Sequence, residues 1–178
     1  VMKNIKISDC EIISRTNAIK VGTETTYDIS DIYINDCKLF MTDLYPGSVS
    51  GISLEACDGT VLSNVNIDNI TMDRCTCPIF IRLANSQSAN AIEFGKKGKG
   101  GADSNVFRFN MLSEIRDINI SNITATRVEL PVIIAGYKQF CITKRVKNVT
   151  LKNIFVDYYA CEETVDKRRF IPEYAKTY

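Results

Sequence analysis

The chain of 178 residues has no histidine, no excess of charge and no long apolar run. Without histidine its cysteines match no zinc pattern, because Cys75 and Cys77 stand alone as a close pair. With 22 basic and 21 acidic residues, the net charge of +1 gives no field that attracts nucleic acid or an anionic membrane. No stretch approaches the roughly 18 apolar residues of a membrane-spanning helix, and the first residues lack a signal-peptide pattern. We therefore expect no metal, no cofactor, and no nucleic-acid or membrane partner.

One seven-residue phrase occurs five times. The copies are NIKISDC, DIYINDC, NVNIDNI, DINISNI and NVTLKNI, which begin at Asn4, Asp31, Asn64, Asp117 and Asn148. In every copy the residues two before the start, and one, three, six and eight after it, are apolar. Such a repeat is typical of a solenoid whose stacked units bury a shared core.

Within each copy, apolar and polar residues alternate. The alternation then shifts by one position and resumes. The slip falls on Asp9, Asp36, Asn69, Asn122 and Asn153. Asn and Asp tolerate a left-handed backbone, so this column predicts a corner whose stacked side chains bond from repeat to repeat. We interpret it as a polar ladder inside the solenoid.

A further strand is expected 15 residues after the phrase start, at Ile19, Ile79 and Val132. In the second repeat it is expected at Ile52, after six additional residues. The pattern predicts about three short parallel strands per repeat and no helix. We expect one domain over residues 1–178, with a mobile glycine- and lysine-rich loop inserted at 85–113.

Seven cysteines are an odd number, and we expect most of them to be buried thiols. Cys10 and Cys37 occupy the same position of successive repeats, a spacing that would allow a disulfide. Stacked reduced thiols are the favoured interpretation, because cysteine is a good small core residue.

Several phrases together resemble a known enzyme family. They are, in order, NIKISDC (4–10), NAIKVGTET (17–25), GISLEACDG (51–59), PIFIRL (78–83) and IPEY (171–174). This order is similar to the β-helix of glycoside hydrolase family 28, which includes polygalacturonases and rhamnogalacturonan-degrading enzymes. The resemblance implies an all-β, right-handed parallel β-helix of the pectin lyase type, with about five to six coils. It also favours a secreted or periplasmic location.

The resemblance implies inverting hydrolysis of a glycosidic bond by a cluster of aspartates. In that family they lie in an NTD and a DD motif before the NAIKVGTET phrase, and neither motif is in this chain. No catalytic residue can be carried over, so we expect a fragment of a longer β-helix that is inactive alone. Uncapped coils would favour end-to-end self-association. The alternative is a naturally short protein with irregular caps.

Two motifs of the polygalacturonase branch are changed. Where the branch has GHG, this chain has Thr16-Asn17-Ala18, and where it has RIK, this chain has Ser53-Leu54-Glu55. A hydroxyl and a carboxyl group therefore stand where that branch has the cations that bind the carboxylate of the substrate. By this resemblance, a neutral or differently branched sugar is favoured over galacturonate at that position.

Two rows of outward-facing residues are predicted across the strands expected at Ile19, Ile52, Ile79 and Val132. They are Lys20, Ser53, Phe80, Ile133 and Gly22, Glu55, Arg82, Ala135. If these rows line the family's groove, Lys20, Ser53, Glu55 and Arg82 bind sugar and Phe80 supports a pyranose face. Neighbouring strands lie about 4.8 Å apart, so Glu55 and Arg82 can meet. The alternative is a structural ion pair, with Phe80 covered by the inserted loop.

Glu24 and Asp58 are weaker candidates for catalysis. Inverting hydrolysis needs two carboxyl groups about 6.5–9.5 Å apart, which neighbouring repeats could supply. The ordinary role of acids near turns is solvation or capping.

The leading hypothesis is part of a glycoside hydrolase that acts on a pectin-like polysaccharide, or an oligosaccharide derived from it. The alternative is a non-catalytic carbohydrate-binding or structural β-helix. Calcium-dependent lysis ranks last, because the outward rows show no acidic cluster.

Overall fold

All regular elements in the described part of the chain are β-strands. The computed structural model describes residues 1–22, 25, 27–41, 49–57, 59–84, 113–139 and 142–159. The strands are β1 (Met2–Ser8), β2 (Glu11–Ser14), β3 (Asn17–Val21), β4 (Ile29–Met41), β5 (Ser50–Ala56), β6 (Val61–Asp73), β7 (Cys77–Leu83), β8 (Glu114–Val128), β9 (Ile133–Ala135), β10 (Tyr137–Gln139), β11 (Ile142–Lys144) and β12 (Lys147–Tyr158).

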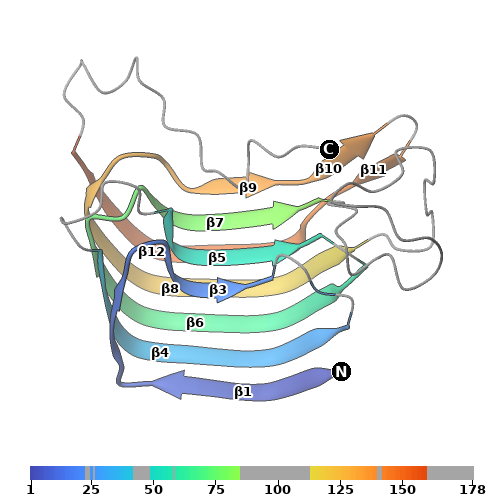
Figure 1. The fold of residues 1–178 in the computed structure, drawn as a ribbon, viewed down its shortest axis with the longest axis horizontal. Helices are drawn as coiled ribbons and strands as arrows, with labels where there is room; N and C mark the ends of the chain where they lie inside the picture. Colours follow the sequence, from blue (N-terminus) through green and yellow to red (C-terminus); the bar gives the residue numbers. More distant parts are fainter. Residues whose placement is uncertain are drawn as a thin grey trace, which may run out of the picture.

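Two parallel sheets contain most of these strands (Figure 1). The 6-stranded sheet, here called the long sheet, has the order β1-β4-β6-β8-β12, with β2 also paired to β4. The 4-stranded sheet, here called the short sheet, has the order β3-β5-β7-β9. From β3 to β9 the chain alternates between the two sheets. The prediction of an all-β fold with parallel strands and no helix is confirmed for the described residues.

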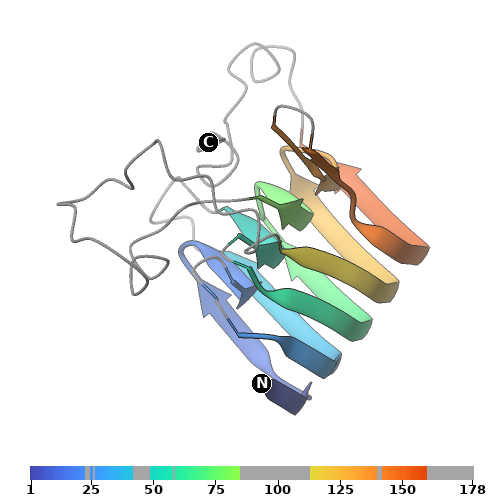
Figure 2. The same cartoon turned by 90° about the vertical axis from the view of Figure 1, so that its right-hand side faces the viewer.

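The register of the long sheet stacks the copies of the phrase in the predicted alignment. Ile7, Ile34, Ile67, Ile120 and Leu151 are successive partners across β1, β4, β6, β8 and β12. The apolar columns one and eight residues after the phrase start are paired in the same way. Figure 2 shows the strands following one another in sequence order along the stack. The apolar columns are therefore confirmed as physical rows.

The predicted corners are also confirmed. The residues at the phase slip have left-handed backbones, with φ between 52° and 55°; they are Asp9, Asp36, Asn69, Asn122 and Asn153. Only in the first repeat does the slip divide the chain into two strands, β1 and β2. In later repeats pairing resumes directly beyond the corner, so β4, β6, β8 and β12 are single bent strands. The expectation of three short strands per repeat is wrong for those repeats.

The corner side chains form a ladder on the surface of the molecule. Asn69 donates from Nδ2 to Oδ1 of Asp36 at 2.6 Å, and Asn153 donates to Oδ1 of Asn122 at 2.9 Å. Asn122 instead donates to Asp68 at 2.8 Å. The residues of this ladder are exposed, so the prediction of an internal ladder is wrong. The exposed amides and carboxylates retain contact with water, which avoids the cost of burying them.

A second left-handed column begins each phrase and was not predicted. Its φ values lie between 49° and 60°, at Asn4, Asp31, Asn64, Asp117 and Asn148. Side chains bond across strands here too: Asn64 donates to Asp31 at 2.7 Å, and Asn148 donates to Asp117 at 2.9 Å. Asn and Asp are the non-glycine residues that adopt this backbone at least cost. Two positions of the phrase thus have a left-handed backbone in all five copies, and each is occupied by Asn or Asp.

The main core lies between the two sheets. Ile67 and Ile120 of the long sheet, and Leu54 and Ile81 of the short sheet, are at most 1% exposed and belong to one apolar cluster. On the edge strand β12, Leu151 is 37% exposed. The same aliphatic row is therefore fully buried in its central strands and half-buried at its edge.

Two features lie outside the predicted pattern. Strands β10 and β11 pair antiparallel, which the repeat did not indicate. Of the loop predicted at 85–113, only Ser113 is described; it is buried, and its hydroxyl accepts a hydrogen bond from the Gly59 amide at 2.9 Å.

Acid should weaken the fold through the ladder carboxylates. The amide of Asn69, followed by that of Asn35, lowers the pKa of Asp36 below its ordinary value of 3.8; Asp31 and Asp117 are lowered similarly, first by Asn64 and by Asn148. A lowered folded pKa means that the contribution is complete above about pH 4 and is lost as the pH falls through the folded value. We expect the urea midpoint of Asp36→Asn to fall less between pH 5 and pH 2 than that of the wild type. Equal slopes for Asp36→Asn and the wild type would contradict the prediction.

Shortening two side chains of one aliphatic row to alanine should show how deeply each is buried, through the loss in free energy of unfolding. Ile120 and Leu151 are register partners, but only Ile120 is fully buried. We expect Ile120→Ala to lower the free energy of unfolding by about 2–5 kcal/mol, because it leaves a cavity. Leu151→Ala should cost about 1 kcal/mol, since its side chain already contacts water. Urea denaturation measures both, and equal losses would contradict the described packing.

Candidate functional site

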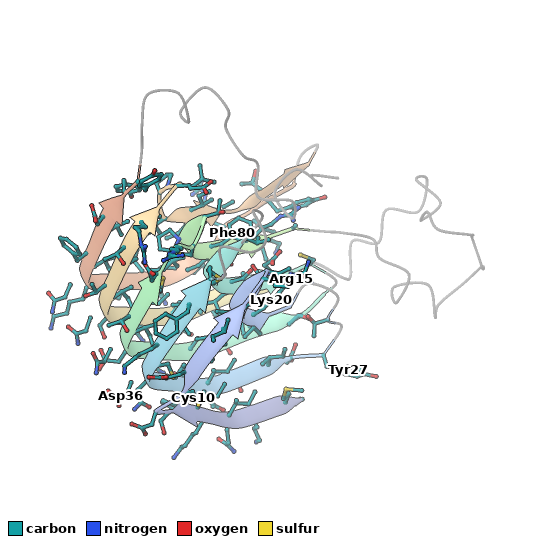
Figure 3. The ribbon with its side chains drawn as sticks, turned by 60° about the vertical axis from the view of Figure 1, so that its left-hand side comes forward. Cys10, Arg15, Lys20, Tyr27, Asp36 and Phe80 are labelled. Carbon is teal, nitrogen blue, oxygen red and sulfur yellow. The ribbon has the colours of Figure 1, made fainter. Side chains whose placement is uncertain are left out.

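The two predicted outward rows exist on the short sheet. Lys20 pairs with Ser53, Ser53 with Phe80, and Phe80 with Ile133. In the neighbouring row Glu55 pairs with Arg82. Alternation explains the placement, since the intervening residues of β5 and β7 belong to the main core. Figure 3 shows Lys20 and Phe80 away from the bend where Cys10 and Asp36 lie.

Glu55 is the centre of a charged cluster, defined here as Lys20, Ser53, Glu55 and Arg82. Its Oε1 accepts a hydrogen bond from the Ser53 hydroxyl at 2.7 Å and lies 3.3 Å from Lys20 Nζ. Its Oε2 lies 3.9 Å from Arg82 Nη1. The cluster therefore places one acid between two cations, with a hydroxyl fixing one of its oxygens.

The contact between Glu55 and Arg82 was predicted, and the other two contacts were not. Ser53 and Glu55 are two residues apart on one strand, and therefore on one face, which the alternation could have indicated. Lys20 reaches Glu55 diagonally, because its direct partner is Ser53. Diagonal neighbours lie within reach of a long side chain, but its conformation decides whether they meet.

The second oxygen of Glu55 has an unusual environment. Oε2 is buried and accepts no hydrogen bond from the described residues. At 3.9 Å, Arg82 Nη1 is beyond the range of about 2.7–3.2 Å for such a bond. An unsatisfied buried acceptor costs about 1–3 kcal/mol. The cluster thus contains a polar atom that lacks a donor.

The cluster is largely shut away from solvent. Ser53, Glu55 and Phe80 are 0% exposed and Arg82 is 5% exposed, whereas the Lys20 side chain retains 27% of its exposure. Every residue of β5 and β7 is buried, so both faces of these strands are covered. The interpretation of the rows as the floor of an open groove does not describe this structure. Lys20 is the residue of the charged cluster whose side chain is exposed to solvent.

Phe80 belongs to a small apolar cluster on the face of the short sheet opposite the main core. Its buried members are Val49, Cys77 and Phe80, and Leu130 and Ile133 pack against them. Phe80 therefore packs against residues that precede β7 in the sequence and against residues that follow it. Its ring is not available as an exposed platform in this structure.

A close backbone contact fixes β3 beside Glu55. Gly22 has a φ of +96°, and a Cβ at this position would lie 2.1 Å from the Glu55 carbonyl oxygen. Only glycine avoids both the clash and the strained backbone. The glycine of the NAIKVGTET phrase therefore allows the chain to pass directly against the strand that carries the cluster.

Asn17 forms a polar contact between strands. The hydroxyl of Ser50 donates to Oδ1 of Asn17 at 2.6 Å. Asn17 and Ser50 are register partners at the start of β3 and β5. The amide therefore links the two strands before they reach the charged cluster.

The weaker catalytic candidates lie outside the described residues. Neither Glu24 nor Asp58 is placed, so the separation of the two carboxyl groups stays a prediction. Among the described ranges, no group of three or more His, Cys, Asp or Glu side chains could hold a metal ion. None of the same residues belongs to a helix long and apolar enough to cross a membrane.

The described cysteines are free thiols. They are Cys10, Cys37, Cys57, Cys75 and Cys77, while Cys141 and Cys161 lie outside the described residues. Burial raises the pKa of Cys37, and it raises the pKa values of Cys75 and Cys77 to about 12. Such thiols remain protonated near neutral pH and are poor nucleophiles. The expectation of buried thiols is confirmed for Cys37, Cys57, Cys75 and Cys77, whereas Cys10 is only partly buried.

Comparison of the chain with protein-family models, curated proteins and solved structures gave no match. The resemblance to glycoside hydrolase family 28 therefore depends on the sequence phrases alone.

Removing the Glu55 carboxyl should destabilise the fold strongly. Glu55→Ala leaves the buried Arg82 guanidinium and the Lys20 ammonium without their shared partner, which typically costs about 3–5 kcal/mol. The control is Glu114→Ala, since Glu114 pairs with Arg116 and Lys147 while its side chain stays 30% exposed. Exposed pairs contribute about 0–1 kcal/mol, so this control should be nearly neutral. Chemical denaturation compares the two, and similar losses would contradict a special role for the cluster.

Proposed function

We propose that this chain is part of a right-handed parallel β-helix of the glycoside hydrolase family 28 type, acting on a pectin-like polysaccharide or its side chains. Inverting hydrolysis is assigned to aspartates that this chain does not contain. The chain itself supplies stacked repeats and part of a sugar-binding surface.

The observation that carries the proposal is the register of the two parallel sheets. Strands that alternate along the chain pair with the equivalent strand of the next repeat, at the offsets of the repeated phrase. A chain that turns twice per repeat and returns beside its earlier strand is the arrangement expected of a β-helix. The specific phrases NAIKVGTET and GISLEACDG, which resemble the family, lie on β3 and β5 and the turns after them.

Lys20 is the group proposed to contact sugar first. It projects from the short sheet, where the resemblance places the groove, and it keeps part of its surface in water. An ammonium group has three donors, which suit the hydroxyl and ring oxygens of a sugar. Oε1 of Glu55 lies 3.3 Å from the Nζ atom of this ammonium group and forms an ion pair with it.

One observation favours a second candidate, a non-catalytic structural β-helix. Ser53, Glu55 and Phe80 are fully buried, as in an internal ion-pair network covered by apolar residues. In that case the cluster joins neighbouring strands and binds nothing. Sugar affinity, or its absence, separates the two candidates.

The test combines a titration with a hydrolysis assay. We expect the chain to bind homogalacturonan or rhamnogalacturonan fragments without releasing reducing ends. Lys20→Gln should weaken binding by about tenfold, the value of one hydrogen bond to a charged group. The control is Lys38→Gln, a 59% exposed lysine paired with Glu11 on the long sheet. Turnover by the chain alone would overturn the assignment of catalysis to absent aspartates. No binding of any pectic fragment would favour the structural candidate.

A further inference from the structure

Cys10 and Cys37 are direct neighbours on adjacent strands at the bend of the long sheet, where Figure 3 labels Cys10. The register of β1 and β2 against β4 is the same before and after this bend, so the two cysteines occupy equivalent positions. The amide of Lys38 donates to the Cys10 carbonyl at 2.8 Å, which continues the parallel pairing here. Neighbouring strands lie about 4.8 Å apart, within the roughly 4.4–6.8 Å between Cα atoms that a disulfide spans.

The two thiol groups also have the same orientation. Sγ of Cys10 donates to the Ser8 carbonyl at 3.1 Å, and Sγ of Cys37 donates to the Asn35 carbonyl at 3.2 Å. These two acceptors belong to register partners. Burial raises the pKa of Cys37, and a hydrogen bond with the Cys10 side chain contributes to the rise. The thiols therefore interact directly across the two strands.

The two sulfur atoms differ in their access to solvent. Cys37 is 1% exposed, whereas Cys10 is only partly buried. Cys10 joins β1 to β2, and among the described strands these two pair with β4 alone. Ile5 and Ile7 of β1 are likewise only partly buried against the core. Strands at such an edge open more readily than central strands, so a reagent in solution reaches Cys10 before Cys37.

We propose that Cys10 and Cys37 form a redox site, which a low-molecular-weight disulfide such as oxidised glutathione converts to a disulfide bond. The Cys10 thiolate attacks one glutathione sulfur, which releases the other half as a thiol and leaves a mixed disulfide. Cys37 then loses its proton and attacks the Cys10 sulfur, which releases the second glutathione. The two cysteines lose two electrons and two protons, and the two glutathione thiols gain them. The site is independent of the proposed carbohydrate function.

The two cysteines have different roles in this reaction. A thiol with a raised pKa is a poor nucleophile toward reagents in solution, which protects Cys37 from direct attack. Its attack on the mixed disulfide is intramolecular, and the strand pairing already places the two sulfur atoms together. Cys10 is therefore the residue that reacts first, and Cys37 is the residue that resolves the adduct.

The test treats the folded chain with oxidised glutathione and maps every cysteine by mass spectrometry. We expect Cys10 to be linked to Cys37, with a loss of two hydrogen atoms, while Cys57, Cys75 and Cys77 remain free thiols. In urea the preference for this pair should disappear, because the unfolded chain no longer holds the two strands together. A stable glutathione adduct on Cys10, a bond between another pair, or no reaction at Cys10 would overturn the inference.

Two variants test the order of attack. Cys37→Ser should stop at the glutathione adduct on Cys10, whereas Cys10→Ser should leave Cys37 unmodified because it is buried. The control Cys57→Ser should still form the bond. In the oxidised wild type, amide exchange in β1 and β2 should slow by about tenfold or more, since the bond ties both strands to β4. Unchanged exchange in the cross-linked chain would contradict the described strand pairing, and if a variant does not fold, the mapping of the wild type still decides.

Discussion

Parallel backbone pairing is the constraint on which the rest of the structure depends. Once Ile67 pairs with Ile34 and Ile120, every residue of β6 has its face and its neighbours fixed, because a shift by one residue would exchange core and surface. The intervals between phrases differ widely, yet the register is the same in each. The length differences are therefore taken up by the connections, where added residues cost little.

The bends that allow this pairing depend on residues tolerant of a left-handed backbone. Two columns of Asn and Asp supply them, and their amides also join one repeat to the next. Arg74 and Arg127 form a third left-handed position without that residue type, at φ of 62° and 55°. Both guanidinium groups pair with Asp73. At this position an ion pair accompanies the bend in place of the amide ladder.

The charged cluster connects three neighbouring strands of the short sheet. Glu55 links β3 with β7 through Lys20 and Arg82, and this holds the short sheet together. Its unsatisfied oxygen is a cost that a purely structural pair could avoid with a better-placed donor.

The sequence by itself determined which residues lie side by side. The period of two along a strand and the repeat of the phrase place Glu55 beside Arg82, and Asp36 beside Asn69. The ladder's exposure, the hairpin of β10 and β11, and the burial of Phe80 were decided only by the tertiary structure. Phe80 is covered by Val49 and Leu130, which come from other parts of the chain. Alternation specifies the face on which a side chain lies, but whether that face is open depends on distant segments that no local pattern encodes.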